Sequence, residues 1–197
     1  MQKPSDDTIV HENKTFTEVD YSGKKLRNRE FVHCEFISCD FSKSDLVDNT
    51  FEDCTFKECD FSMALVAGTG FRNAIFNGCK LLGIDFGQCN KFMFSFSFTD
   101  CRLDYSLFYA GKLKKTIFRN CTLKDVDFSE ADLGASVFDQ CDLTGTRFSN
   151  TILEKTDFRT ATNYAIDPDG NKMKKAKFSN SQLAGLLTKH NLDIDFD

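Results

Sequence analysis

Residues 34–61 read CEFISCDFSKSDLVDNTFEDCTFKECDF, and a large apolar residue recurs there at every fifth position. A period of five fits neither the 3.6 residues per turn of a helix nor the two-residue alternation of a strand. It marks an internal repeat, which has to be interpreted before any single motif. One phase of the repeat comprises Phe31, Phe36, Phe41, Leu46, Phe51, Phe56, Phe61, Val66, Phe71, Phe76, Leu81 and Phe86. A second phase, two residues late, comprises Phe98, Leu103, Phe108, Leu113, Phe118, Leu123, Phe128, Leu133, Phe138, Leu143, Phe148, Leu153 and Phe158.

The position two residues before each large residue is nearly always small, and the position directly before it is often Asp. Each unit is therefore expected to turn one large and one small side chain inward and three side chains outward. All nine cysteines occupy the small position: Cys34, Cys39, Cys54, Cys59, Cys79, Cys89, Cys101, Cys121 and Cys141. The aspartates are expected to accept backbone N–H bonds at turns, which makes most of them structural.

Segments such as CDFSK, CDFSM, VDFSE, ADLGA and CDLTG resemble the unit of the pentapeptide-repeat family, over roughly residues 29–160. The resemblance implies an all-β fold, a right-handed quadrilateral β-helix in which four pentapeptides make one square coil. Six or so coils would stack at the strand spacing of about 4.8 Å. No coil could bury its apolar side chains alone, so each depends on its neighbours.

The cysteine spacing could also suggest a metal site or disulfides. A coil of four pentapeptides would stack Cys39, Cys59 and Cys79 in one column, and Cys101, Cys121 and Cys141 in another. Metal sites pair cysteines two to four residues apart, and this chain has no such pair. Parallel side chains one strand spacing apart are also too distant for the usual disulfide geometry. We therefore expect cysteine to act as a small hydrophobe, with no metal and no cofactor.

The chain is expected to form a single pentapeptide-repeat domain over residues 1–197. Degenerate units at the start suit a polar terminal coil, and the end of the chain departs from the five-residue period. The expected parts are an N-terminal cap coil (1–28), a first repeat stretch (29–90), a phase break (91–98), a second repeat stretch (99–178) and a C-terminal helix and strand (179–197).

The phase break leaves two alternatives open. Lys91 falls in a core position, and alternating phenylalanines follow before the second phase begins. The coil could absorb the two extra residues as a bulge and bury the extra rings. Alternatively, Phe92 or Met93 is left exposed as a contact for a partner.

The C-terminal segment is expected to cap the open core. Residues 179–191, SNSQLAGLLTKHN, look helical, with Ser179 or Ser181 as the cap, and residues 192–197 alternate as a strand would. In the Qnr-type and mycobacterial fluoroquinolone-resistance members of the family, such a helix also forms an end-to-end dimer interface. The resemblance thus implies a homodimer, with the interface expected at Leu183, Leu186, Leu187, Leu192 and Ile194.

Composition restricts the partners. The net charge is −5, no apolar run reaches membrane-spanning length, and the N-terminus is polar, so a soluble chain outside the membrane is expected. Nine free buried cysteines suit the reducing cytoplasm. Direct nucleic-acid binding is not expected, because it needs clustered Lys and Arg. Between residues 125 and 142 there are six acids and no base: Asp125, Asp127, Glu130, Asp132, Asp139 and Asp142.

No catalytic constellation is present in the sequence, and we interpret the chain as a non-enzyme. The resemblance to the Qnr-type branch implies binding to the type II topoisomerases DNA gyrase and topoisomerase IV, by an acidic rod that mimics DNA, and modulation of quinolone action. The expected partner surface is the six acids with Phe92 and Met93. A scaffold for another protein is the alternative. An enzyme site at residues 91–98 or in the C-terminal segment is a more distant one.

Overall fold

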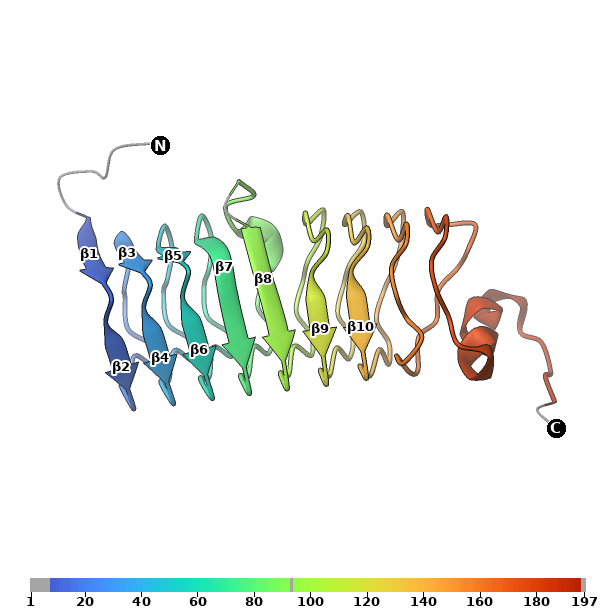
Figure 1. Ribbon diagram of the computed structural model, residues 1–197, viewed down its shortest axis with the longest axis horizontal. Coiled ribbons are helices and arrows are strands. Elements are labelled where there is room, and N and C mark those ends of the chain that lie inside the picture. Colours follow the sequence, from blue (N-terminus) through green and yellow to red (C-terminus); the bar gives the residue numbers. More distant parts are fainter. Residues whose placement is uncertain (1–7, 93, 196–197) are drawn as a thin grey trace.

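The structure, a computed structural model, describes residues 8–92 and 94–195, which form an elongated rod of stacked coils (Figure 1). The predicted right-handed quadrilateral β-helix is confirmed. Of the expected N-terminal cap coil, residues 1–7 lie outside the described residues. Parallel strands run along two adjacent sides of the rod: β1 (Ile9–Glu12), β2 (Thr15–Thr17), β3 (Arg29–Val32), β4 (Glu35–Ile37), β5 (Thr50–Glu52), β6 (Thr55–Lys57), β7 (Gly70–Asn77), β8 (Phe94–Thr99), β9 (Ile117–Arg119) and β10 (Val137–Asp139).

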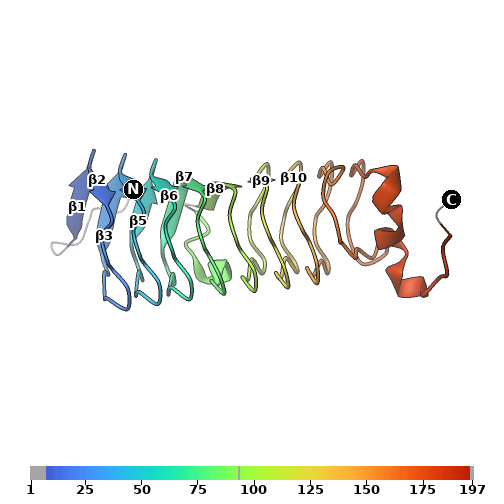
Figure 2. The same cartoon turned by 90° about the horizontal axis from the view of Figure 1, so that it is seen from below.

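The four sides of the rod follow from the register of neighbouring coils. Side 1 contains β1, β3 and β5, and side 2 contains β2, β4, β6, β9 and β10, while β7 and β8 span both sides. Side 3 is the column of bridges through Asp40 and Asp60, and side 4 is the column through Asp45 and Leu65. Outside the phase break, paired residues are 20 apart along the chain, so that four pentapeptides close one coil, and Figure 2 shows the coils edge-on.

Each corner of the coil is made by the residue two positions after the large one. His33, Ser38, Lys43 and Asp48 all have φ between 51° and 58°, the left-handed region. This conformation costs an L-residue about 1 kcal/mol, and backbone hydrogen bonding offsets the cost. On sides 3 and 4 the chain makes β-turns there, as in the 3.1 Å bond from Ser44 N–H to the Phe41 carbonyl.

One uninterrupted column of aromatic rings runs along side 2 for the length of the rod. Neighbouring rings are stacked with centroids 4.8 to 5.3 Å apart. Its members are Phe16, Phe36, Phe56, Phe76, Phe98, Phe118, Phe138, Phe158 and Phe178. The spacing along the chain is 22 residues from Phe76 to Phe98 and 20 elsewhere, so the phase break lies within a single coil.

The small inward position has a hydrogen-bonding role as well as a packing role. Cys59 Sγ donates to the Phe36 carbonyl of the preceding coil at 3.5 Å, and Thr156 Oγ1 donates to the Leu133 carbonyl at 2.8 Å. The Leu133 carbonyl also accepts the Ser136 N–H at 3.0 Å, so the side chain at the small position gives this carbonyl a second bond, one between coils, which Ala could not make. All nine cysteines are free and buried, as predicted. Burial raises the pKa of Cys54 to about 12, which keeps this thiol protonated.

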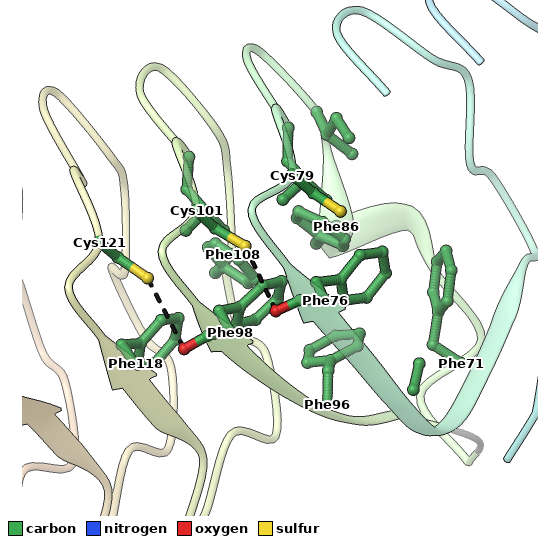
Figure 3. Close-up of a cluster of buried hydrophobic side chains, with 14 of the residues drawn as sticks. Phe71, Phe76, Cys79, Phe86, Phe96, Phe98, Cys101, Phe108, Phe118 and Cys121 are labelled. Carbon is green, nitrogen blue, oxygen red and sulfur yellow. Dashed lines mark hydrogen bonds between the residues drawn. The ribbon is translucent and has the colours of Figure 1, made fainter. Parts of the chain in front are cut away.

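The prediction of two separate cysteine columns is wrong. The Cys101 Sγ donates to the Phe76 carbonyl, as the Cys121 Sγ donates to the Phe98 carbonyl one coil further on (Figure 3). Bonds of this kind join residues 23 apart within each phase and 25 apart across the break. The two extra residues are thus fully absorbed before Phe98, and both phases share one column: Cys39, Cys59, Cys79, Cys101, Cys121 and Cys141.

Phe96 fills the core at the phase break. Lys91, which falls at a core position in the sequence, is exposed, and Phe94 is only partly buried. Phe96 occupies a position where a small residue is usual, and its ring reaches within 5.9 Å of Phe71 and 5.5 Å of Phe86 between centroids. Its partner in the β7–β8 register is Ala74, and the register shifts just before this pair.

Substituting Phe96 with Ala should therefore cost about 3–5 kcal/mol in the free energy of unfolding, because it opens a cavity at the break. The matched control is Phe92→Ala, four residues away on the exposed bump, which should change stability by less than about 0.5 kcal/mol. Urea unfolding followed by circular dichroism measures both. Equal effects of the two substitutions would contradict this account of the break.

Candidate protein-binding surfaces

The six acids between residues 125 and 142 do not form one patch. Each pentapeptide turns the chain onto the next side, so a run of this length encircles the rod once. Asp127 lies on side 4, Asp132 on side 1, Asp139 on side 2 and Asp142 on side 3 of the next coil. The remaining two lie at corners, Asp125 between sides 3 and 4 and Glu130 between sides 4 and 1.

Most of these acids are already paired with bases from adjacent coils. Four ion pairs are formed: Arg147–Asp127 at 3.6 Å, Lys114–Asp132 at 3.1 Å, Arg119–Asp139 at 3.0 Å and Lys124–Asp142 at 3.4 Å. Such exposed pairs add little stability each, but they neutralise the surface. A stretch that is purely acidic in sequence therefore presents a mixed charge pattern in space.

The two other acids of this run lie at corners of the rod. Asp125 and Glu130 both have positive φ, and neither forms an ion pair in the described part of the chain. The neighbouring Glu130 carboxylate raises the pKa of Tyr109 through a hydrogen bond and its charge.

The aspartates before the large residues are mainly turn caps, as predicted. Asp40 Oδ1 accepts the Ser42 N–H at 2.8 Å, and Asp127 Oδ1 accepts the Ser129 N–H at 2.8 Å. Burial of Asp142 acts to raise the pKa of its carboxyl, but hydrogen bonds from Thr144 and from the Asn163 amide outweigh it and lower that pKa to about 2. These carboxylates thus help to hold the coil as well as charging its surface.

The bump at the phase break exposes one aromatic ring. The side chain of Phe92 is 94 % exposed, the largest value among the apolar residues described. The Lys112 ammonium lies 6.0 Å from its ring centroid, at the limit of a cation–π contact. Both alternatives for the break hold in part, since Phe96 and Phe98 are buried while Phe92 is exposed. Met93, the other predicted contact, lies outside the described residues.

The C-terminal segment covers the end of the core, as Figures 1 and 2 show. The expected helix is present as two short 3-10 helices, η2 (Asn180–Leu186) and η3 (Thr188–His190). Gly185 lies so close to Tyr164 that an added Cβ would come within 2.7 Å of the Tyr164 ring. The Ile166 N–H donates to the Gly185 carbonyl at 2.9 Å, which ties η2 to the last coil.

The expectations for this segment are met only in part. Ser179 occupies the N-cap position of η2, as predicted, but its hydroxyl makes no capping bond and lies 3.2 Å from the Ser181 hydroxyl. Residues 192–195 form no strand, and Phe196 lies outside the described residues. Of the five residues predicted at a dimer interface, Leu186 packs against the core, whereas Leu183, Leu187, Leu192 and Ile194 are exposed.

A basic hollow on side 1 was not anticipated from the sequence. Gly134 and Ala135 carry no large outward side chain, and this coil and its neighbours surround them with four lysines and two acids: Lys114, Lys115, Lys155, Lys172, Asp132 and Glu154. The hollow measures about 360 Å³ and is open to solvent. Its signal in the sequence is the spacing of Lys115 and Lys155, which differ by two coils.

Neither a cluster of metal ligands nor a membrane-spanning helix is present among the described residues. Within residues 8–92 and 94–195, no cluster of three or more His, Cys, Asp or Glu side chains could hold a metal ion. Over the same described ranges, no helix is long and apolar enough to cross a membrane.

The rod defines a class, the four-sided repeat proteins, and comparison with known families identifies the chain's own family. A model described as a pentapeptide repeat region matches residues 93–187, and one described as pentapeptide repeats (8 copies) matches residues 34–69. The chain belongs to the pentapeptide-repeat family.

Solved structures share the fold. A trypsin-treated variant of QnrB1, a plasmid-mediated fluoroquinolone resistance protein, is 22% identical with a TM-score of 0.55, over 96% of this chain and 98% of that one. HetL, a pentapeptide repeat protein involved in heterocyst differentiation regulation from the cyanobacterium Nostoc sp. strain PCC 7120, is 15% identical with a TM-score of 0.58, over 90% and 88%. None of the curated proteins compared matches the chain.

Proposed function

We propose that this protein is a non-catalytic, protein-binding rod of the cytoplasm whose partner is a type II topoisomerase. The observation that carries the proposal is the rod itself, with an exposed aromatic bump at its middle and a capped C-terminal end. Its alignment with QnrB1 along nearly the whole of both chains supports the same architecture. Nine free buried thiols suit a reducing compartment.

The proposed contact set is Phe92 with the two unpaired acids Asp125 and Glu130. Phe92 offers a large apolar surface, the kind of side chain that dominates protein interfaces when it becomes buried. Acids held in ion pairs with neighbouring coils have less charge to offer a partner. This pairing weakens the case for DNA mimicry and favours, as a second candidate, a scaffold that binds a protein by its side chains rather than by its negative field.

A supercoiling assay tests the topoisomerase proposal. Purified DNA gyrase acts on relaxed plasmid with the protein at about micromolar concentration, the range of a moderate protein interface, with and without a fluoroquinolone. Either inhibition of supercoiling or relief of drug inhibition is expected. Phe92→Ser should weaken the effect about tenfold, whereas Ile117→Ser on side 2 should leave it unchanged. No effect of the unsubstituted protein in either condition would exclude this partner.

We also propose that the C-terminal segment joins two copies end to end. Leu187, Leu192 and Ile194 line a shallow pocket beyond η2, and their exposure leaves an apolar surface at the end of the rod. Pairing of two such ends would bury these side chains and cover the capping segment from outside.

Light scattering tests the dimer with Leu187→Asp combined with Leu192→Asp. The unsubstituted chain should have twice the monomer mass of 22.4 kDa, and the double variant should have the monomer mass. Ile117→Asp, which adds the same charge at a distant exposed position, should remain dimeric. A double variant that stays dimeric would exclude this segment as the interface.

A further inference from the structure

Three successive coils bring five large apolar side chains together on side 4 and on its corner with side 3. These coils are held in register by the bond from Met63 N–H to the Leu82 carbonyl, at 2.8 Å, and by the Asp85–Leu107 bridge. The five side chains are between 41 and 64 % exposed: Met63, Leu65, Tyr105, Leu107 and Tyr109. We refer to these five side chains, with residues 83–88 of the coil that lies between them, as the side 4 patch.

The side 4 patch has two ridges and a trough. Met63 and Leu65 project from one coil, and Tyr105, Leu107 and Tyr109 project from the coil two levels further on. The coil between them presents Gly83, Asp85 and Gly87. The Met63 side chain lies over Gly83, with its Sδ 2.7 Å from where a Cβ would stand, so the low part of the trough is the floor around Asp85 and Gly87. The two ridges are about 10 Å apart, which is twice the strand spacing.

Folding does not require leucine at the ridge positions. Asp85 lies in the same column as Leu65 and Leu107, and its carboxylate caps the Gly87 N–H at 3.0 Å. Leucine at this position gives up that cap and exposes apolar surface instead. Large apolar side chains exposed next to one another on a protein surface mark contact surfaces.

Within its own three coils, the side 4 patch carries negative charge only. Residues 63–68, 83–88 and 105–110, which form this side in the three coils, contain no Lys or Arg. Asp85 stands at the centre. One coil beyond the patch at either end, Asp48 and Glu130 lie at the corner with side 1, while Lys43 lies next to Met63 at the corner with side 3. None of these three carboxylates forms an ion pair with any described residue. A partner that fits must therefore combine apolar side chains with positive charge.

The spacing of outward residues along side 4 matches the spacing of residues along one face of an α-helix. Leu65, Asp85 and Leu107 follow one another at about 4.8 Å per coil. On an α-helix, residues i, i+3 or i+4, and i+7 lie on one face at about 0, 5 and 10.5 Å along the axis. An extended strand repeats on one face at about 6.8 Å, which does not match.

We propose that the side 4 patch binds an amphipathic, basic α-helix of a partner protein, laid along the rod. Apolar side chains at i and i+7 of the helix contact the two ridges, and a Lys or Arg at i+3 or i+4 pairs with Asp85. This inference deepens the proposed protein-binding function by naming the surface and the chemistry of the partner. It does not depend on that partner being a topoisomerase.

Fluorescence anisotropy with a labelled synthetic helix tests the proposal. The probe is a peptide of about 18 residues, long enough for appreciable helix, with Leu at every seventh position and Lys at the third and fourth positions between. The full-length protein should bind this peptide and should not bind a counterpart with Glu in place of Lys. Leu65→Asp combined with Leu107→Asp should weaken binding about tenfold or more.

The control places the same charges at the same repeat position on side 2, as Ile75→Asp combined with Ile117→Asp. Thermal unfolding should show both variants folded, since aspartate is the commonest cap at this position. Binding by the control variant should equal that of the unsubstituted protein. Failure to bind the Lys peptide, equal binding of the Glu peptide, or an equal loss in both variants would overturn the proposal.

The same variants distinguish a partner helix from a second copy of this chain, and the helix-binding proposal from the topoisomerase proposal. A second copy of this chain as occupant would appear as self-association that Leu65→Asp with Leu107→Asp abolishes, and this result would overturn the helix proposal. The peptide assay contains no topoisomerase, so a negative supercoiling assay does not contradict the helix-binding proposal. Conversely, a positive supercoiling assay does not support helix binding if the Lys peptide fails to bind.

Discussion

The stacking of one coil on the next is the constraint on which the rest of the structure depends. A coil has no core of its own, so its Phe or Leu side chains are buried only when the adjacent coil carries the same pattern in register. The column from Phe16 to Phe178, with rings about 5 Å apart, follows directly from that requirement. Backbone hydrogen bonds between coils then fix the register, and outward side chains fall into columns at the same step.

The phase break is tolerated because it preserves this register. Two extra residues leave the coil at the bump around Phe92, while Phe96 fills the core from a position normally occupied by a small residue. The columns of Cys79 and Phe76 therefore continue into those of Cys101 and Phe98. For function, the consequence is a single continuous rod in which side 4 keeps the apolar side chains of its patch and Asp85 in one register across the break.

Much of the fold could be predicted from the five-residue period, because the period lists the core directly. The alignment across the break could not, since a two-residue slip is equally compatible with displaced columns, and the role of Phe96 depends on its facing Ala74. The candidate surfaces were harder to predict. The run from Asp125 to Asp142 looks like one acidic patch in sequence but encircles the rod, whereas Leu65 and Leu107 are far apart in sequence and nearly adjacent in space.

Thiol titration tests the central claim, a single core that continues through the break, most directly. With an aromatic disulfide reagent, the native protein should show nine slow-reacting thiols and the denatured protein nine rapid ones, because burial both shields the sulfurs and disfavours the thiolate. Mass spectrometry then assigns each labelled site. Slow labelling of Cys79 and Cys101, which flank the break, is the predicted result. Rapid labelling of either in the native state would contradict a continuous core.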